Sequence, residues 1–246
     1  MKKIALVTGA AGGLGQAMVR KISQENWDLV VVGRDAQKLE QVFGKQHLQI
    51  AADCSTTDGV KTIFSTLKAE GIQPVALAHC VGNIRLGALH RMAEKDFNDC
   101  LQANLISAFH TLAGFVGSLR NASTGGAAVL VSSAAARVGT PNHEAVAAAK
   151  AGLEGLVRGA ASTYASAGIR INAVAPGMME TPATAGLISS PTARDAAAKQ
   201  YPLPGIGSPT ELAELMCWLL SEQASRVTGQ VWSLDGGFST IRPLVK

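Results

Sequence analysis

The chain has 246 residues, a charged fraction of 16%, a hydrophobic fraction of 47% and a formal net charge of +4 at pH 7. These values favour one well-packed domain and exclude a disordered tail protein. The basic residues are dispersed, so we expect neither nucleic acid nor an anionic membrane as a partner. The four cysteines lack the spacing of a zinc site and the density of a disulfide framework, so we expect no metal site and a reducing compartment.

The first predicted element is a strand at the amino terminus, "KIALVT". Lys2 and Lys3 stand near the start of the chain, as lysines do in a signal peptide, but the apolar run stops at Thr8. No other segment approaches the roughly 18 apolar residues that a membrane helix needs. We therefore expect a soluble, cytoplasmic protein.

A glycine-rich turn, "TGAAGGLG", follows this strand directly and leads into a helical pattern. Glycines let the backbone turn tightly and approach a pyrophosphate, whose charge then meets the helix N-terminus. On its own the motif also fits an ordinary strand-to-helix turn. Its candidate cofactor-binding residues are Thr8, Gly9, Gly13, Leu14 and Gly15.

The second strand, "LVVVG", ends where an NAD site would place an acid on the ribose 2′-hydroxyl. Gly33 and Arg34 stand there instead, and Lys38 follows one turn later. An arginine fork suits a 2′-phosphate, so the sequence favours NADP(H) over NAD(H). The alternative is that Arg34 is a solvated loop charge and Asp35 only caps a helix.

Further short apolar runs alternate with longer stretches of helical periodicity. Strands that are apolar on both faces and separated by helices predict an α/β fold with a doubly wound parallel sheet and a ligand at the carboxyl ends of its strands. The connection 177–208 is long and rich in Gly, Pro, Ala and Ser, so we expect a substrate lid. The remaining runs are "LQIAA", "PVALAHC", "AAVLVS", "IRINAVA" and "QVWSLD", and the helical stretches include 14–25, 56–69, 92–118, 143–166 and 209–222.

Six further motifs follow the glycine-rich turn in order: "AADCS", "QANLIS", "VLVSSAAA", "AAAKAG", "INAVAPGMMETP" and "VTGQVWSLDGG". Through these motifs, nearly the whole chain resembles the short-chain dehydrogenase/reductase family. The resemblance implies one Rossmann-like domain over 1–246 with a seven-stranded parallel sheet. It also implies a nicotinamide cofactor and the interconversion of a carbonyl and an alcohol. Homodimers or homotetramers would pack through the two long helices that carry Asn104 and Lys150.

Carried over by position, the resemblance gives three residues a catalytic role. Asn104 would bend its helix and hold a water of a proton relay, Ser133 would bind the substrate oxygen, and Lys150 would hold the nicotinamide ribose. Each residue alone also has an ordinary reading, as a helix-bend amide, a strand-end hydroxyl or a solvated charge. The other cofactor positions implied are Asp53, at the adenine, Cys54, Gly82, and Pro176, Gly177 and Thr181, at the nicotinamide.

Two departures from the family stand out. The family's "NNAG" is "HCVG" here, residues 79–82, and Val146 occupies the place of the tyrosine in Tyr-x-x-x-Lys. Ser133 precedes Val146 by the family's usual 13 residues, so the alignment is not at fault. A positioned acid contributes about 10²- to 10⁴-fold to a rate, and valine cannot titrate.

His143 is the first candidate for a substitute acid, because on a helix it shares a face with Val146 and Lys150 and an imidazole suits proton transfer near neutral pH. The alternative is that His143 is only a polar residue at the start of the helix, without a role in proton transfer. Tyr201, in the expected lid, is a weaker candidate. Tyr164 lies about five turns beyond Val146, too far to act.

Two functions remain open on this reading. The first is an NADP(H)-dependent oxidoreductase acting on a small carbonyl or alcohol with altered acid/base machinery. The second is a non-catalytic NADP(H)-binding protein, either a sensor or a partner subunit. The retention of Ser133, Asn104 and Lys150 in register favours the enzyme, since residues that act as a unit lose their value singly.

Overall fold

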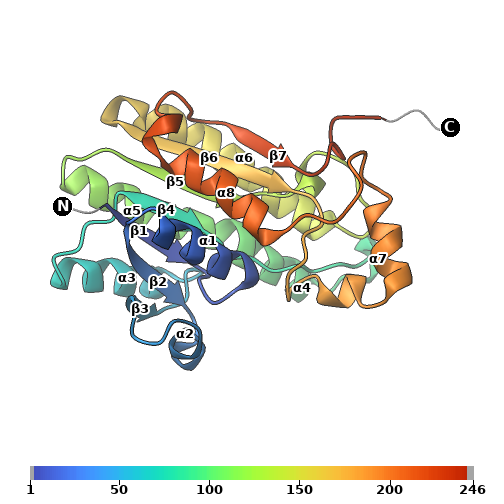
Figure 1. The fold of residues 1–246 in the computed structure, drawn as a ribbon, viewed down its shortest axis with the longest axis horizontal. Helices are drawn as coiled ribbons and strands as arrows, with labels where there is room; N and C mark the ends of the chain where they lie inside the picture. Colours follow the sequence, from blue (N-terminus) through green and yellow to red (C-terminus); the bar gives the residue numbers. More distant parts are fainter. Residues whose placement is uncertain (1–2, 243–246) are drawn as a thin grey trace.

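The computed structural model describes residues 3–242, in which seven parallel strands form one sheet in the order β3-β2-β1-β4-β5-β6-β7 (Figure 1). All seven predicted runs form strands, which confirms the doubly wound α/β fold. Most strands are buried on both faces, as their continuous apolar sequences indicate. The strands are β1 (Ile4–Thr8), β2 (Asp28–Gly33), β3 (Leu48–Ala51), β4 (Ala76–His79), β5 (Gly126–Val131), β6 (Ile169–Pro176) and β7 (Val231–Leu234).

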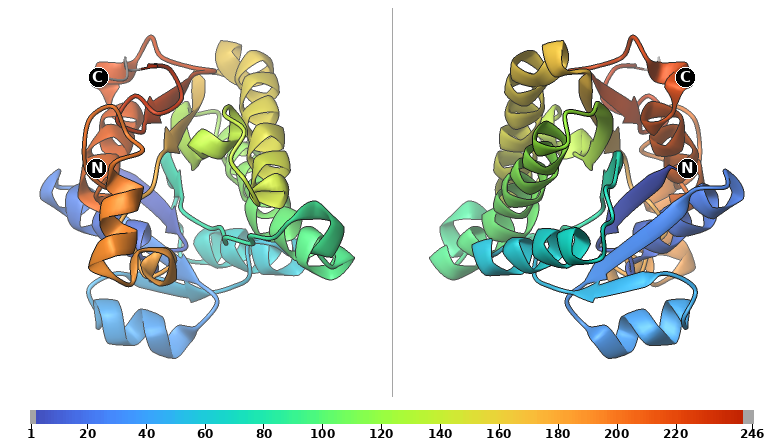
Figure 2. Two further views of the ribbon diagram at one scale, coloured as in Figure 1. Left: turned by 90° about the vertical axis from the view of Figure 1, so that its right-hand side faces the viewer. Right: turned by 90° about the vertical axis from the view of Figure 1, so that its left-hand side faces the viewer.

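Helices cover both faces of the sheet, as the end-on views of Figure 2 show. α1, α2 and α8 pack on one face, and α3, α5 and α6 pack on the other. Each layer buries the apolar side of its helices against alternate residues of the strands. The helices on the two faces are α1 (Gly13–Gln24), α2 (Ala36–Phe43), α8 (Pro209–Leu220), α3 (Thr57–Ala69), α5 (Ser107–Asn121) and α6 (Glu144–Tyr164).

The stretch 92–118, expected as one helix, is divided. It forms α4 (Glu94–Leu101), the π-helical turn η2 (Gln102–Ile106) and α5. The amide of Asn104 donates a hydrogen bond to the carbonyl oxygen of Cys100 at 2.9 Å, one turn back. Such a side-chain contact within the backbone ladder accompanies a local irregularity that apolar periodicity does not reveal.

The carboxyl ends of the strands meet at one edge of the sheet. The strand order reverses between β1 and β4. Such a switch point is where doubly wound folds bind ligands. The connection 177–208 lies beyond this edge and contains α7 (Pro191–Ala198), which Figure 1 shows projecting from the carboxyl ends. No helix in residues 3–242 is long and apolar enough to cross a membrane.

Short helical turns complete the chain. The turn η3 follows β5 and leads toward α6, and η5 lies in the long connection before α7. They are η1 (Leu89–Arg91), η3 (Ala134–Ala136), η4 (Ala165–Ala167), η5 (Ala185–Ile188) and η6 (Glu222–Ala224).

Candidate active site

The glycine-rich turn joins β1 to α1 at the switch point. Gly9 has a φ of +66°, and a side-chain carbon at Gly15 would lie 2.2 Å from the carbonyl oxygen of Gly9, so both positions require glycine. Gly12, the N-cap of α1, has no side chain to occupy the N–H groups of the first turn. The helix N-terminus is therefore open to an anion.

A cavity of about 490 Å³ lies beside this turn, at the carboxyl ends of β1, β2 and β3. Arg34 and Lys38 line it. Gly33 contributes no carboxylate, and the carboxylate of Asp35 instead caps α2 by accepting a hydrogen bond from the Lys38 backbone at 3.0 Å. The cavity thus presents two cations where a 2′-phosphate would lie, and the residues also lining it include the predicted Gly9, Asp53, Cys54 and Gly82.

The adenine end of the predicted site is formed by Asp53 and Cys54. One carboxylate oxygen of Asp53 accepts hydrogen bonds from the backbone and hydroxyl of Ser55, at 2.9 and 2.7 Å. This contact orients the carboxylate. Burial raises the pKa of the Cys54 thiol to about 11, so the thiol is neutral near pH 7 and acts as part of the wall.

The side chain of Thr8 points away from the cavity beside the glycine-rich turn. It was expected among the cofactor-binding residues, but it is fully buried and pairs with the Nδ1 atom of His79 at 2.8 Å. Thr8 and His79 face each other across β1 and β4, a pairing that depends on strand register. The Thr8 hydroxyl therefore holds the two strands together instead of facing the cavity.

His79 stands where the family has its first Asn, and it is equally enclosed. Its Nε2 atom lies 3.2 Å from the Ser107 hydroxyl, which itself donates to the carbonyl oxygen of Ala103. Because the Ser107 hydroxyl already donates its hydrogen bond to Ala103, it accepts from Nε2, and Nε2 must carry the imidazole proton. Burial lowers the pKa of His79 to about 3, with a smaller effect from Lys150. His79 is thus a neutral structural link between the sheet and the start of α5.

Lys150 reaches from α6 to the carboxyl end of β5. Its Nζ atom donates a hydrogen bond to the carbonyl oxygen of Val131 at 2.7 Å, and the residue is only 6% exposed. No ion pair involves it within the described chain. Burial lowers the pKa of Lys150 to about 8, against a smaller raising effect of Cys100 and Cys80. A buried amine that titrates near neutrality is suited to proton transfer.

Gly82 brings Asn104 and Lys150 to the same place. A side-chain carbon at Gly82 would lie 2.7 Å from the Oδ1 atom of Asn104 and 3.5 Å from the Nζ atom of Lys150. The Asn104 amide nitrogen is bonded to Asn83 and Cys100, but its buried Oδ1 atom has no hydrogen-bond partner in residues 3–242. This acceptor is therefore available to a hydrogen-bond donor beside Lys150.

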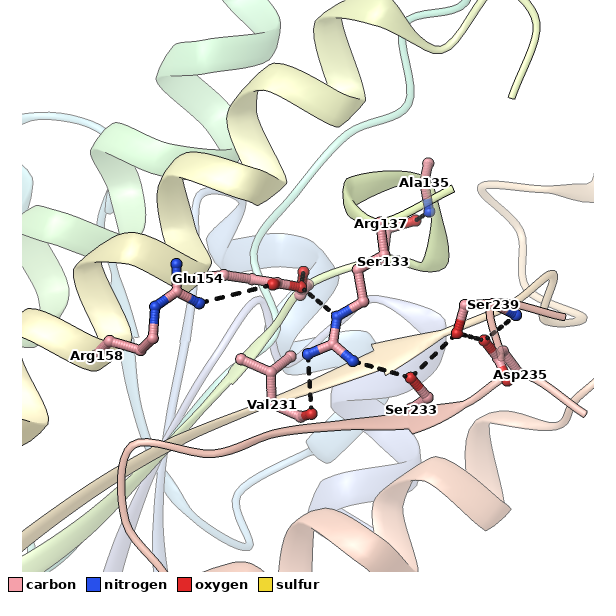
Figure 3. A network of polar contacts seen from close by, with 10 residues as sticks. Ser133, Ala135, Arg137, Glu154, Arg158, Val231, Ser233, Asp235 and Ser239 are labelled. Atoms are coloured by element: carbon pink, nitrogen blue, oxygen red, sulfur yellow. Dashed lines mark hydrogen bonds and ion pairs between the residues drawn. The ribbon is translucent and has the colours of Figure 1, made fainter. Parts of the chain in front are cut away.

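Ser133 follows β5 and caps η3, accepting a hydrogen bond from the Ala135 backbone at 3.2 Å. Arg137 ends the same turn, and Figure 3 shows its guanidinium reaching Glu154 on α6 and the edge strand β7. Its Nε atom lies 3.4 Å from a Glu154 oxygen, and another guanidinium nitrogen donates to the Val231 carbonyl at 3.0 Å. Arg137 thereby fixes the short turn that carries Ser133.

Glu154 and Ser132 were missed by the sequence analysis. Ser132 donates a hydrogen bond to Glu154 at 2.8 Å, and both residues are buried. Glu154 lies one turn after Lys150, so α6 contacts two consecutive residues at the end of β5. A buried acid four residues after Lys150 was the available signal, but its partners come from distant parts of the chain.

The place of the missing tyrosine is apolar. Val146 is 5% exposed and lies in a small cluster with Ala145 and Cys100, against which Met92 and Phe97 pack. The cluster joins the start of α6 to α4. None of these side chains offers an acidic proton near pH 7, since burial raises the pKa of Cys100.

The proposed substitutes are separated from this place or already engaged. His143 is the N-cap of α6, and its Nδ1 atom donates to the carbonyl oxygen of Pro141 at 2.8 Å. The Tyr201 hydroxyl accepts a hydrogen bond from the Met178 backbone at 2.6 Å, behind Gly177. Tyr164 ends α6, at the opposite end from Val146.

The nicotinamide positions lie at the end of β6 and in the long connection. Pro176 ends β6, and the Gly177 backbone donates to the carbonyl oxygen of Leu234 at 3.1 Å. Thr181 is brought to the glycine-rich turn, since a side-chain carbon at Gly13 would lie 3.2 Å from its Cβ atom. The connection therefore packs beside the first residue of α1.

A parallel sheet with a glycine-rich turn and a cationic cavity at its switch point defines a dinucleotide-binding α/β protein. A family model described as "Enoyl-(Acyl carrier protein) reductase" matches residues 9–239. The chain belongs to the short-chain dehydrogenase/reductase family. It is 33% identical over 245 residues to carbonyl reductase family member 4 of Danio rerio, covering 98% of this chain and 100% of the relative.

Other relatives extend the comparison. Cis-4-hydroxycyclohexanecarboxylate dehydrogenase of Sinomonas cyclohexanicum is 34% identical over 249 residues, with 98% of each chain covered. Among solved structures, ElxO with NADP bound superposes with a TM-score of 0.89 at 26% identity, covering 97% of this chain and 99% of that one. The likeness spans nearly the whole chain in both cases.

Proposed function

We propose that this chain is an NADP(H)-dependent oxidoreductase that interconverts a small carbonyl compound and its alcohol with altered acid/base machinery. The observation that carries the proposal is the continuity of the site. The cavity that begins at Arg34 and Lys38 is also lined by Gly82, against which Asn104 and Lys150 converge. The positions predicted to bind the cofactor and to act in catalysis therefore lie at one edge of the sheet.

The residues present fit NADP(H). The open N-terminus of α1 suits a pyrophosphate, and Arg34 with Lys38 suits a 2′-phosphate that an acid at Gly33 would repel. The buried Oδ1 atom of Asn104 has no partner among the described residues and can accept a hydrogen bond from a bound group. The solved relative ElxO with NADP bound supports the same cofactor.

When bound, the cofactor would supply or accept a hydride. The side chains of this protein would position the substrate and stabilise the developing charge. The Ser133 hydroxyl would hold the substrate oxygen by a hydrogen bond. Lys150 would bind the cofactor's ribose and place a positive charge beside the oxygen as negative charge develops. The connection 177–208, as a lid, would exclude water through its contact with Gly13.

A second function is favoured by the apolar cluster around Val146. A site in which the usual acid is replaced by a packed valine is what a non-catalytic NADP(H) sensor or a partner subunit would retain. This hypothesis expects tight cofactor binding without turnover. It therefore differs from the oxidoreductase hypothesis in one measurable property, the turnover of a carbonyl compound.

The two functions are separated by measuring binding and turnover on the same preparation. NADPH binding is followed by nicotinamide fluorescence, and NADPH oxidation is followed with a panel of ketones and aldehydes. Turnover that is lost in Ser133→Ala, with NADPH affinity retained, would establish the oxidoreductase. Tight NADPH binding without turnover of any compound would favour the sensor or partner subunit.

A further inference from the structure

The site raises the question of which group supplies the proton. The Nδ1 proton of His143 is donated to the carbonyl oxygen of Pro141, and the Tyr201 hydroxyl, which accepts a hydrogen bond from the Met178 backbone and keeps its own proton, lines a different cavity. His79 is buried, neutral and bonded at both ring nitrogens. Among the described residues that meet at Val131 and Gly82, the ammonium of Lys150 carries protons that it can release near neutral pH.

The geometry of Lys150 suits that role. One of its three N–H bonds is directed at the Val131 carbonyl, two residues before Ser133. Nζ also lies 3.5 Å from the place where a Gly82 side chain would begin, and Gly82 lines the cofactor cavity. Two protons therefore remain for the space between the cavity and the turn that carries Ser133.

We propose that Lys150 itself delivers the proton to the substrate oxygen, directly or across one water molecule, and so replaces the acid that Val146 cannot provide. This role rests on the proposed oxidoreductase function. Reduction adds a hydride, supplied by NADPH, to the carbonyl carbon. The C=O π electrons move to oxygen, an N–H bond of the ammonium breaks, and an O–H bond forms. The neutral amine then regains its proton from solvent.

The groups that face Lys150 leave it able to lose a proton. His79 and Cys80 approach from the end of β4, and Cys100 approaches from α4. His79 is neutral, and burial raises the pKa of Cys80 to about 12 and also raises that of Cys100. Glu154, one turn along α6, is bonded to Ser132 and Arg137. Within residues 3–242 no anion therefore stabilises the ammonium near pH 7, and its pKa of about 8 matches an acid that works near neutrality.

The first test needs no cofactor. Lysine side chains labelled with ¹³C at Cε are titrated by NMR in the full chain, and the Lys150 signal is assigned as the one missing from Lys150→Arg. We expect this signal to titrate near pH 8, well below the exposed lysines. A midpoint above pH 10, together with the others, would overturn the proposal.

The second test uses turnover. Reduction should be constant below about pH 8 and fall about tenfold per pH unit above it, because only the ammonium can donate. Lys150→Arg keeps the charge but cannot release a proton, so it should lose about 10²- to 10⁴-fold in reduction while still binding NADPH. Lys61→Arg, on the exposed face of α3, is the matched control.

The outcomes distinguish a failure of the proton-donor role of Lys150 from a failure of the proposed oxidoreductase function. A parent that binds NADPH but reduces nothing overturns the oxidoreductase function, and the proton donor falls with it. A parent that turns over without a pH dependence near 8, or a folded Lys150→Arg that still reduces at the parental rate, overturns only the role of Lys150. If Lys150→Arg does not fold, the pH profile of the parent decides.

Discussion

The guanidinium of Arg137 and the carboxylate of Glu154 form an ion pair at 3.4 Å across the end of the sheet. Glu154 is buried, and the pair joins the turn after Ser133 to α6 (Figure 3). Glu154→Ala should lower the free energy of unfolding by about 1 to 3 kcal/mol, because it leaves the Ser132 hydroxyl and Arg137 without their acceptor. Urea unfolding measures this.

Arg158 provides the control for this prediction. It lies 3.9 Å from the same carboxylate, but its side chain is 61% exposed. Arg158→Ala should therefore change stability by less than about 1 kcal/mol. Equal losses in the two variants would show that Glu154 acts only as a surface charge.

Arg34 should determine the choice of cofactor. Arg34→Ala should weaken NADPH binding by about 1.5 to 3 kcal/mol, the size of a charged hydrogen bond, and leave NADH affinity nearly unchanged. Fluorescence titration of both cofactors gives the ratio. Lys45→Ala, which changes a lysine outside the cavity lining, is the control. An unchanged NADPH preference in Arg34→Ala would contradict the assignment of a 2′-phosphate site.

His79 should make the protein sensitive to acid. Its pKa is about 3 when folded and about 6.5 when unfolded, so between these values the unfolded chain binds more protons. Its contribution is therefore complete above about pH 6.5 and is lost as the pH falls toward 3, by up to about 1.4 kcal/mol per pH unit.

The comparison variant for this prediction is His79→Asn, which removes the titrating group. Urea unfolding of both proteins at a series of pH values isolates the histidine, because the other groups titrate alike in the two. A stability difference that stays constant from pH 7 to pH 4 would mean that the imidazole is not held neutral.

The strands could be predicted because continuous apolar runs are the direct consequence of burial on both faces. The contact of the Thr8 side chain could not be predicted, for a physical reason. Its partner His79 is 71 residues away, and only the register of β1 and β4 makes them neighbours. The missed contact of Glu154 with Ser132 has the same origin, since each residue alone reads as an ordinary polar position.

The division of the helix at Asn104 marks another limit of the sequence. Apolar periodicity runs through 92–118, but the amide of Asn104 bonds to the backbone of Cys100 and Asn83, and the helix takes a π turn there. The helix α2 was anticipated only in the alternative that Asp35 caps a helix, and its extent was not predicted. Its eight residues are too few for periodicity to distinguish from a loop.

The oligomer remains a prediction that the exposed face of α5 can test. Phe109 on this helix is 49% exposed, which is unusual for so large an apolar ring. We expect a homodimer or homotetramer in sedimentation experiments, and Phe109→Glu should shift it toward smaller species. A monomeric parent at micromolar concentration, with no partner found, would count against both the homo-oligomer and the partner-subunit hypothesis.

Val146→Tyr should restore an acid to this site. The phenol would stand one turn from Lys150 and near Ser133, and carbonyl reduction with NADPH should rise toward the 10²- to 10⁴-fold that a positioned acid supplies. The gain should be largest above about pH 8, where Lys150 has lost its proton but a phenol retains its own.

The larger ring must enter the cluster of Val146, Cys100 and Phe97, so overpacking could cost about 1 to 3 kcal/mol of stability. Unfolding and NADPH binding are therefore measured in the same variant. His143→Ala in the parent is the companion experiment, because a large fall in turnover there would assign the proton to the imidazole. A folded, NADPH-binding Val146→Tyr that reduces no carbonyl would mean that the pocket no longer admits a substrate, and the binding-protein function would then stand alone.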